Sequence, residues 1–219
     1  MALTKTTKLQ AINTMLSTVG EPPVNSLTAQ RSDSLIAQNI LDEVTREVLS
    51  YGWQFNTDEN VVMTPETSSG YIYVSDSIVR VDINPLRMTN YDIVIRGNRL
   101  YDRTSNSFVF TEPLTVIQVH LFDFDELPEA AKRYIAIRAS RIFQDRMVGS
   151  TTLHGFNAQD EVMALAKMTE YENEGDRLEC IGYRPCRHEE GRGYGKEGEC
   201  ERAVPLGIKW CTKSRRHGA

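Results

Sequence analysis

The spacing of apolar residues changes twice along this 219-residue chain, and these changes constrain the fold more than any single motif. Before about residue 50 and after about residue 127, apolar side chains recur every three or four positions, which is the period of an amphipathic helix. Between residues 53 and 121 the period falls to two, with frequent turn residues, as in an antiparallel sheet. We therefore predict an α+β protein: a four-helix bundle of two N-terminal and two C-terminal helices, an inserted antiparallel β-rich domain and an irregular C-terminal tail.

The helices are expected at about residues 5–19, 34–50, 127–148 and 158–174. Ser32 or Asp33 is the expected N-cap of the second helix, and Gly52 follows its end. The segment STTLHGFN at 150–157 is predicted to be a loop, with Asn157 capping the last helix. The inner face of that helix is expected to comprise Val162, Leu165, Ala166 and Thr169.

The β-rich insert is expected to contain several short strands. Gly97 and Asn98 form a favourable hairpin turn between two of them. The candidate strands lie at residues 60–63, 71–74, 78–83, 91–96, 99–102, 107–110 and 114–121.

The helix at 127–148 has the most informative sequence. It begins at Leu127 and Pro128, and Gly149 closes it. Acidic residues gather at its N-terminus, where negative charge is favoured by the helix dipole. They are Asp123, Asp125, Glu126 and Glu129. At about 100° per residue the apolar side chains form one core-facing stripe. It comprises Ala131, Ile135, Ala139, Ile142 and Phe143.

The same helix carries five basic residues. Arg138 and Arg146 are placed at or inside the edge of the apolar stripe, whereas Lys132 and Arg133 are predicted to point elsewhere. Arg141 lies between Arg138 and Arg146 in the sequence. Two interpretations of the arginines remain open. Their stems pack while their head groups reach water or cap carbonyls, or the head groups contact an acidic surface on a neighbouring subunit.

The net charge of −5 is unevenly distributed. Residues 179–219 contain nine Lys and Arg against six Asp and Glu, so this segment carries +3 and residues 1–178 carry −8. An acidic body argues against tight binding of a phosphate backbone, although not against DNA passing nearby. The chain has no run of 18 apolar residues and no basic-then-apolar leader, so we expect no membrane partner and assembly in the cytoplasm.

Catalytic motifs are scarce. The patterns G-x-S-x-G, H-E-x-x-H and the P-loop do not occur, and nothing ties His120 or His154 to a nucleophile. The acidic cluster at 123–129 leaves one enzymatic alternative, a glycan hydrolase that uses two of its carboxylates. Because acids at a helix N-terminus commonly serve stability alone, we predict no catalytic residue and no cofactor.

Residues 179–219 differ from the body in composition, with half of the glycines and no apolar periodicity. Such a segment buries too little apolar surface to offset the entropy of ordering, so we predict it to be extended or disordered. Its cysteines and histidines match no compact zinc spacing, so no metal site is predicted. They are Cys180, Cys186, His188, Cys200, Cys211 and His217. The basic, aromatic end is interpreted as a solvated terminus, with contact to nucleic acid or an acidic protein surface as the alternative. It contains Lys209, Trp210, Lys213, Arg215 and Arg216.

Several separate blocks of the sequence occur in the order seen in one known family. They are GEPPVNSL at 20–27, YGWQFNTDENVV at 51–62, YVSDSIVRVD at 73–82, RGNRLYDRTSNSFVF at 96–110 and the stretch 121–150. With these blocks the chain resembles the tail tubular protein A family, the head-to-tail adaptor of short-tailed, podovirus-type bacteriophages. The resemblance covers residues 8–178, so residues 1–178 are expected to form the adaptor domain.

The resemblance implies a virion protein of the tail without enzymatic activity. It would form a ring of twelve copies between the portal protein and the nozzle, tail tubular protein B. The ring would contribute a surface for tail fibres, and DNA would leave through its lumen without sequence-specific binding. A closed ring requires two different, complementary surfaces. We predict that Arg138 and Arg146, with Arg141 beside them, form one side and that Asp123, Asp125 and Glu126 form the other.

Residues 179–219 depart from the family pattern, in which the chain ends soon after the last helix. A shifted reading frame, a fused remnant and a lineage-specific arm remain as explanations. Because the C-terminal segment of such adaptors helps to engage the portal, the departure bears on how this chain would dock there.

Overall fold

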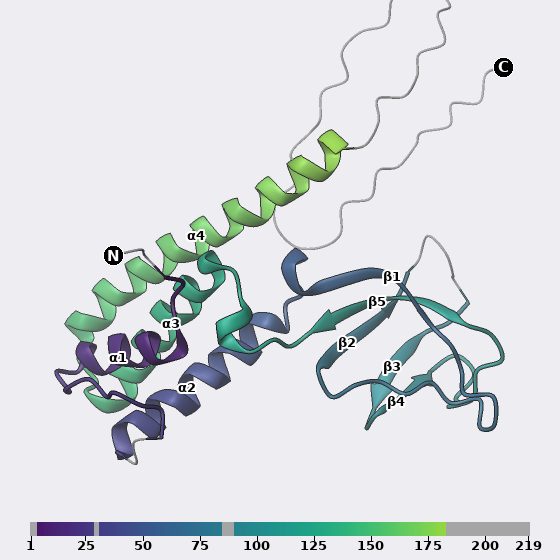
Figure 1. Cartoon of the computed structure of the whole chain (residues 1–219), viewed down its shortest axis with the longest axis horizontal. Helices are drawn as coiled ribbons and strands as arrows, with labels where there is room; N and C mark the ends of the chain where they lie inside the picture. Colours follow the sequence, from purple (N-terminus) through teal and green to yellow (C-terminus); the bar gives the residue numbers. More distant parts are fainter. Residues whose placement is uncertain (1–3, 29–30, 85–89, 183–219) are drawn as a thin grey trace, which may run out of the picture. The chain divides into compact units, whose positions relative to one another are not determined.

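The computed structural model describes residues 4–28, 31–84 and 90–182, without the side chains of 151–153 and 174–182. Four α-helices and two antiparallel sheets make up this part of the chain, so the α+β class is confirmed (Figure 1). The helices are α1 (Lys8–Thr18), α2 (Ser32–Leu49), α3 (Glu129–Met147) and α4 (Thr151–Gly182). Short 3-10 helices η1 (Gln54–Asn56) and η2 (Phe124–Glu126) stand where the chain enters and leaves the strands. In the described residues, no helix is both long and apolar enough for a membrane span.

The four helices share one hydrophobic core. α3 packs against α1, α2 and α4, and α1 packs against α2. The predicted stripe of α3 is confirmed, because Ala131, Ile135, Ala139 and Phe143 are buried and Ile142 is partly buried against the same core. Gly149 ends α3 as expected: its φ of +67° is a left-handed conformation that favours glycine, and its N–H donates to the Gln144 carbonyl at 3.2 Å.

Helix boundaries show where local signals mislead. α2 begins at Ser32, and its N-cap Arg31 provides no side-chain cap, so the prediction of Ser32 or Asp33 as the cap is wrong. α1 begins after Thr7, which forms a capping box with Gln10 that we did not anticipate from the sequence.

The largest difference concerns α4. The segment 150–157, predicted as a loop, is helical from Thr151, so Asn157 lies inside the helix and does not cap it. Packing against α3 overrides the weak helix propensity of these polar residues. The predicted inner face is also wrong, since the residues that pack inward are Ala164 and Met168. The four residues predicted to face the core are all exposed: Val162, Leu165, Ala166 and Thr169. α4 continues beyond the expected domain boundary at residue 178.

The β-rich insert contains β1 (Thr57–Met63), β2 (Ile78–Ile83), β3 (Ile93–Arg96), β4 (Arg99–Asp102) and β5 (Leu114–His120). One sheet has the order β1-β5-β2, and β3 pairs with β4 in a separate hairpin. Gly97, with φ of +64°, occupies the first of its two turn positions, so the predicted hairpin is confirmed. Both sheets contribute to a second hydrophobic core, which includes Val81, Leu100 and Val116.

Two predicted strands are reduced to single bridges. Segment 71–74 forms one bridge, between Tyr73 and Arg99, and segment 107–110 forms one, between Ser107 and Asp102. Alternation of buried and exposed residues is nonetheless present in 71–74, where Ile72 and Val74 are buried. The alternation of apolar residues therefore predicted correctly which side chains of 71–74 are buried. Neither segment, however, forms a continuous ladder of backbone hydrogen bonds with a neighbouring strand.

Candidate assembly surface

The acidic loop before α3 is held in place by its apolar neighbours. Phe124 and Leu127 are each 3% exposed and belong to the helical core. Their burial leaves the intervening side chains of Asp125 and Glu126, and that of Asp123, on the surface. The loop therefore presents three carboxylates at the surface, between side chains anchored in the helical core.

The N-terminal segment is bound to this loop by hydrogen bonds. The Thr6 N–H and hydroxyl donate to the two carboxylate oxygens of Glu129, at 2.9 and 2.8 Å, and the Lys8 N–H donates to Asp125 at 2.8 Å. The Thr6 hydroxyl is the largest of the interactions that hold the pKa of Glu129 below its ordinary value. A general acid for glycan hydrolysis needs a raised pKa, so Glu129 is poorly suited to that role.

Lys132 is a structural residue that the sequence analysis misplaced. Its side chain is 1% exposed, and its ammonium donates to the carbonyls of Thr6 at 2.9 Å and Asp125 at 3.0 Å. The prediction that Lys132 points away from the core is wrong. The signal was present, because at about 100° per residue Lys132 falls within the arc between Ala131 and Phe143.

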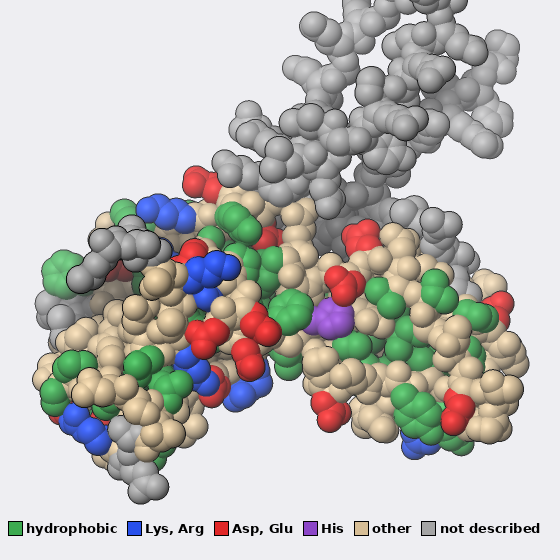
Figure 2. Space-filling model, in the orientation of Figure 1, with side chains coloured by type: hydrophobic (Ala, Val, Ile, Leu, Met, Phe, Trp, Pro, Cys, Tyr) green, Lys and Arg blue, Asp and Glu red, His purple; other side chains and the backbone are tan. Residues whose placement is uncertain are grey.

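An open groove of about 660 Å³ runs beside the acidic loop. It is lined by residues 121–126, by Lys8 of α1, and by Asp42, Thr45 and Arg46 of α2. Lys8 and Asp42 form an ion pair across 2.6 Å. Acidic and basic side chains lie next to one another near the middle of the view in Figure 2. Asp123 and Glu126 differ from their neighbours, because within the described residues their side chains make no hydrogen bond or ion pair.

The three arginines predicted to face a neighbouring subunit all have carboxylate partners within the chain. Arg138 bonds to Glu47 of α2 at 2.7 Å and to Glu161 of α4 at 2.8 Å. Arg141 bonds to Glu161 as well, and Arg146 pairs with Glu43 of α2 at 3.1 Å. These contacts join α3 to α2 and α4. These ion pairs within the chain were not among the contacts predicted for the arginines, and their contact with a neighbouring subunit stays a prediction.

The pKa shifts follow from these contacts. Burial alone would lower the pKa of the Arg138 guanidinium, but Tyr134, Glu47 and Glu161 outweigh burial and raise it. The pKa of Arg141 is raised first by its hydrogen bond to Glu161. Arginine is charged at any physiological pH, and the raised pKa values reflect how strongly these carboxylates favour the charged guanidiniums that link α3 to α2 and α4.

The two described histidines also contact carboxylates. His154 Nδ1 lies 2.8 Å from Asp145 and links the start of α4 to α3. His120 Nε2 lies 3.1 Å from Asp58, at an angle unsuited to a hydrogen bond, and its ring stacks on Phe122. Within the described residues, no three His, Cys, Asp or Glu side chains gather as a metal site would require. The side chain of Cys180 and the other predicted tail residues lie outside what is described: Cys186, His188, Cys200, Lys209, Trp210, Cys211, Lys213, Arg215, Arg216 and His217.

The described part of the chain is thus an α+β protein whose charged groups mostly serve packing between its own elements. The sequence model of the tail tubular protein family matches residues 9–178, more than half of the chain, and the chain therefore belongs to that family. It is also similar to tail tubular protein A of Klebsiella phage KP34, with 29% identity over 133 residues, which is 59% of this chain and 67% of the relative. The chain is accordingly a structural protein of a bacteriophage tail, and its place is the virion.

Proposed function

We propose that this protein is the head-to-tail connector of a short-tailed phage. In this role a ring of twelve copies joins the portal protein to the nozzle, tail tubular protein B, supports tail fibres, and surrounds the channel through which DNA is ejected. The four helices act as a bundle that carries the β-rich insert, and the ring assembles in the host cytoplasm.

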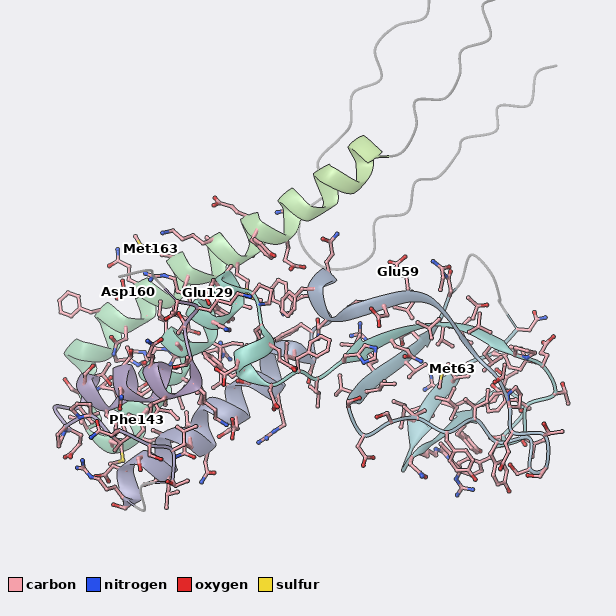
Figure 3. All side chains as sticks on the ribbon, viewed as in Figure 1. Glu59, Met63, Glu129, Phe143, Asp160 and Met163 are labelled. Carbon is pink, nitrogen blue, oxygen red and sulfur yellow. The ribbon has the colours of Figure 1, made fainter. Side chains whose placement is uncertain are left out.

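The observation that carries this proposal is the outer face of α4. Ala164 and Met168 pack inward, yet Phe156 is 66% exposed, Val162 68% and Met163 57%. Met163 lies on the outer side of α4, whereas Phe143 of α3 lies among the helices (Figure 3). A helix with apolar residues on two faces is suited to packing on both, so a neighbouring subunit or tail protein would cover the second face.

Two further features support a ring that assembles through charged surfaces and lets DNA pass. The carboxylates of Asp123 and Glu126 have no partner within the described residues, which leaves them available to another chain. Residues 1–178 carry a net charge of −8, and an acidic wall would repel phosphate and let DNA pass without gripping it.

The test is assembly by the purified full-length chain, alone and with portal and nozzle proteins, observed by negative-stain microscopy and light scattering. Rings are expected for the native chain, and Phe156→Asp with Met163→Asp should abolish them while circular dichroism still reports a folded helical protein. Arg133→Ala, an exposed change on α3, is the control and should leave rings intact. A chain that stays monomeric beside both partners would contradict the proposal. So would cleavage of a polysaccharide that Asp123→Asn and Glu126→Gln abolish, because this outcome would favour the glycan hydrolase.

A further inference from the structure

Two arginines face each other at the turn of the β3–β4 hairpin. The register places Arg96 directly opposite Arg99. Like charges in this position repel, and proteins commonly relieve the repulsion with a nearby carboxylate. Within the described residues neither guanidinium has such an ion pair. The hairpin therefore carries an unneutralised double positive charge.

Aromatic rings hold both guanidiniums in place. Arg96 Cζ lies 3.6 Å from the centroid of the Tyr101 ring, and Arg99 Cζ lies 4.9 Å from Tyr71 and 4.8 Å from Phe108. Tyr101 and Phe108 are in edge contact, with centroids 4.8 Å apart. Cation–π contacts fix the position of a charge without neutralising it. We call this cluster the arginine–aromatic patch; its members are Tyr71, Tyr73, Arg96, Arg99, Tyr101 and Phe108.

The patch has the composition of a protein-binding surface. Tyrosine and arginine are enriched among the residues that dominate binding energy in interfaces, and a planar guanidinium can bind a carboxylate through two parallel hydrogen bonds. Tyr73, at 52% exposed and in edge contact with Tyr71, adds apolar area at its margin. The aromatic support also reduces the entropy lost when the arginines bind.

The distribution of paired charges indicates the partner. Arg138, Arg141 and Arg146 of α3 are already paired with carboxylates of α2 and α4, so these three arginines have less to offer a neighbour. The unpartnered carboxylates Asp123 and Glu126 lie on the acidic loop, and no ion pair joins them to the patch within the described residues. Two guanidiniums on a body of net charge −8 are too few for a phosphate backbone, whose affinity depends on many cation contacts.

We propose that the arginine–aromatic patch of one copy binds the acidic loop of the next copy, with Arg96 and Arg99 facing Asp123 and Glu126. This inference rests on the proposed ring, and it replaces the helical arginines as the cationic side of the subunit interface. A contact between two different surfaces is heterologous, which is the type that a closed ring repeats at every subunit boundary.

The test uses paired charge reversals in the full-length chain. Arg96→Glu with Arg99→Glu, and separately Asp123→Arg with Glu126→Arg, should each raise the concentration for half-assembly by at least about tenfold, since like charges then meet at every boundary. An equimolar mixture of the two variants should restore assembly, because rings of alternating chains regain opposite charges at every boundary. Arg133→Glu, an exposed reversal on α3, is the control and should assemble normally. Circular dichroism of each variant checks that it folds.

The outcomes separate the two proposals. If the native chain forms no ring, the proposed function fails. If native rings form but the reversals leave assembly unchanged, or their mixture does not restore it, the proposed contact is wrong while the connector role stands. Arg96→Gln with Arg99→Gln guards against misfolding by removing the charges without adding repulsion. Rings that persist in this variant while binding of the nozzle protein or of a short DNA duplex is lost would assign the patch to that other partner and overturn the inference.

Discussion

The ammonium of Lys132 lies 2.9 Å from the carbonyl oxygen of Thr6, so a buried charge on α3 holds the segment that precedes α1. The same ammonium donates to the Asp125 carbonyl at 3.0 Å. Lys132→Met keeps the apolar stem but removes both donors. We expect this variant to lose about 2 kcal/mol of unfolding free energy, because two carbonyls lose their partner. Urea denaturation measures the change.

Arg133→Met is the matched control for this prediction. Arg133 is the next residue on α3, but it is exposed, so its replacement should change stability by less than about 0.5 kcal/mol. Equal losses from the two variants would show that the contacts of Lys132 carry no special weight.

Glu161 is the carboxylate on which two arginines of α3 converge, and its side chain is only 12% exposed. Glu161→Gln removes the charge that Arg138 and Arg141 share. We expect a loss of about 1–3 kcal/mol in unfolding free energy and weaker docking of α4 on α3. Calorimetry measures the first effect, and amide hydrogen exchange in α4 measures the second.

The control for Glu161 is Glu43→Gln, which breaks the pair between Glu43 and Arg146. Both members of that pair are more than half exposed, with relative side-chain exposures of 56% and 52%, so solvent already screens the interaction. This variant should change stability far less than Glu161→Gln does. A larger loss from Glu43→Gln would contradict the idea that Glu161 is the central partner.

Local patterns predicted the fold class, the stripe of α3 and the turn at Gly97, because each depends on a few neighbouring residues. Local patterns failed where contacts between residues far apart in the sequence determine the structure. α4 extends back to Thr151 because it packs on α3, a contact that no window of polar residues reveals. Its inner face was misassigned because apolar residues occur on both sides, so periodicity alone does not say which side faces the core.

The exposure of the acidic loop, one side of the proposed interface, could be predicted from residue type. The exposed carboxylates of Asp123 and Glu126 follow from a polar loop between buried anchors. The partners of Arg138 and Arg146 did not follow, because Glu43, Glu47 and Glu161 lie far away in sequence and are brought close only by helix packing. The arginine–aromatic patch was missed for the same reason, since it combines the hairpin with segments before and after it.

Asp102 makes the stability of the β-rich insert dependent on pH. Burial alone would raise the pKa of its carboxyl, but the Ser105 hydroxyl and backbone N–H groups of Thr104, Asp92 and Ser105 outweigh burial and lower it. A lowered pKa means stabilisation that is present above the unfolded value, near pH 4, and is lost as pH falls through the folded value. Unfolding free energy should therefore decrease on acidification from about pH 5 to pH 3.

Asp102→Asn tests this assignment. An amide cannot accept hydrogen bonds on both of its terminal atoms, so the variant should be less stable at neutral pH and lose less stability on acidification. Some dependence of stability on pH should remain in this variant, because the pKa of Glu129 is also lowered. The control is Asp76→Asn, which replaces an exposed carboxylate and should change stability at neutral pH by less than about 0.5 kcal/mol. If Asp102→Asn loses as much unfolding free energy on acidification as the native chain does, Asp102 is not a source of the pH dependence.

Gly155 tests the start of α4, the point where sequence and structure differ most. It lies four residues inside the helix, it is exposed, and an added Cβ would meet no atom within 4 Å. Alanine is favoured over glycine in a helix interior by about 1 kcal/mol, so Gly155→Ala should raise the unfolding free energy by up to that amount. Gly149→Ala is the contrasting variant: φ at Gly149 is +67°, so alanine there should cost about 1 kcal/mol. Chemical denaturation measures the unfolding free energy of both variants, and circular dichroism measures their helix content. If Gly155→Ala leaves the unfolding free energy unchanged, the result would favour the loop that the sequence pattern predicts at 150–157.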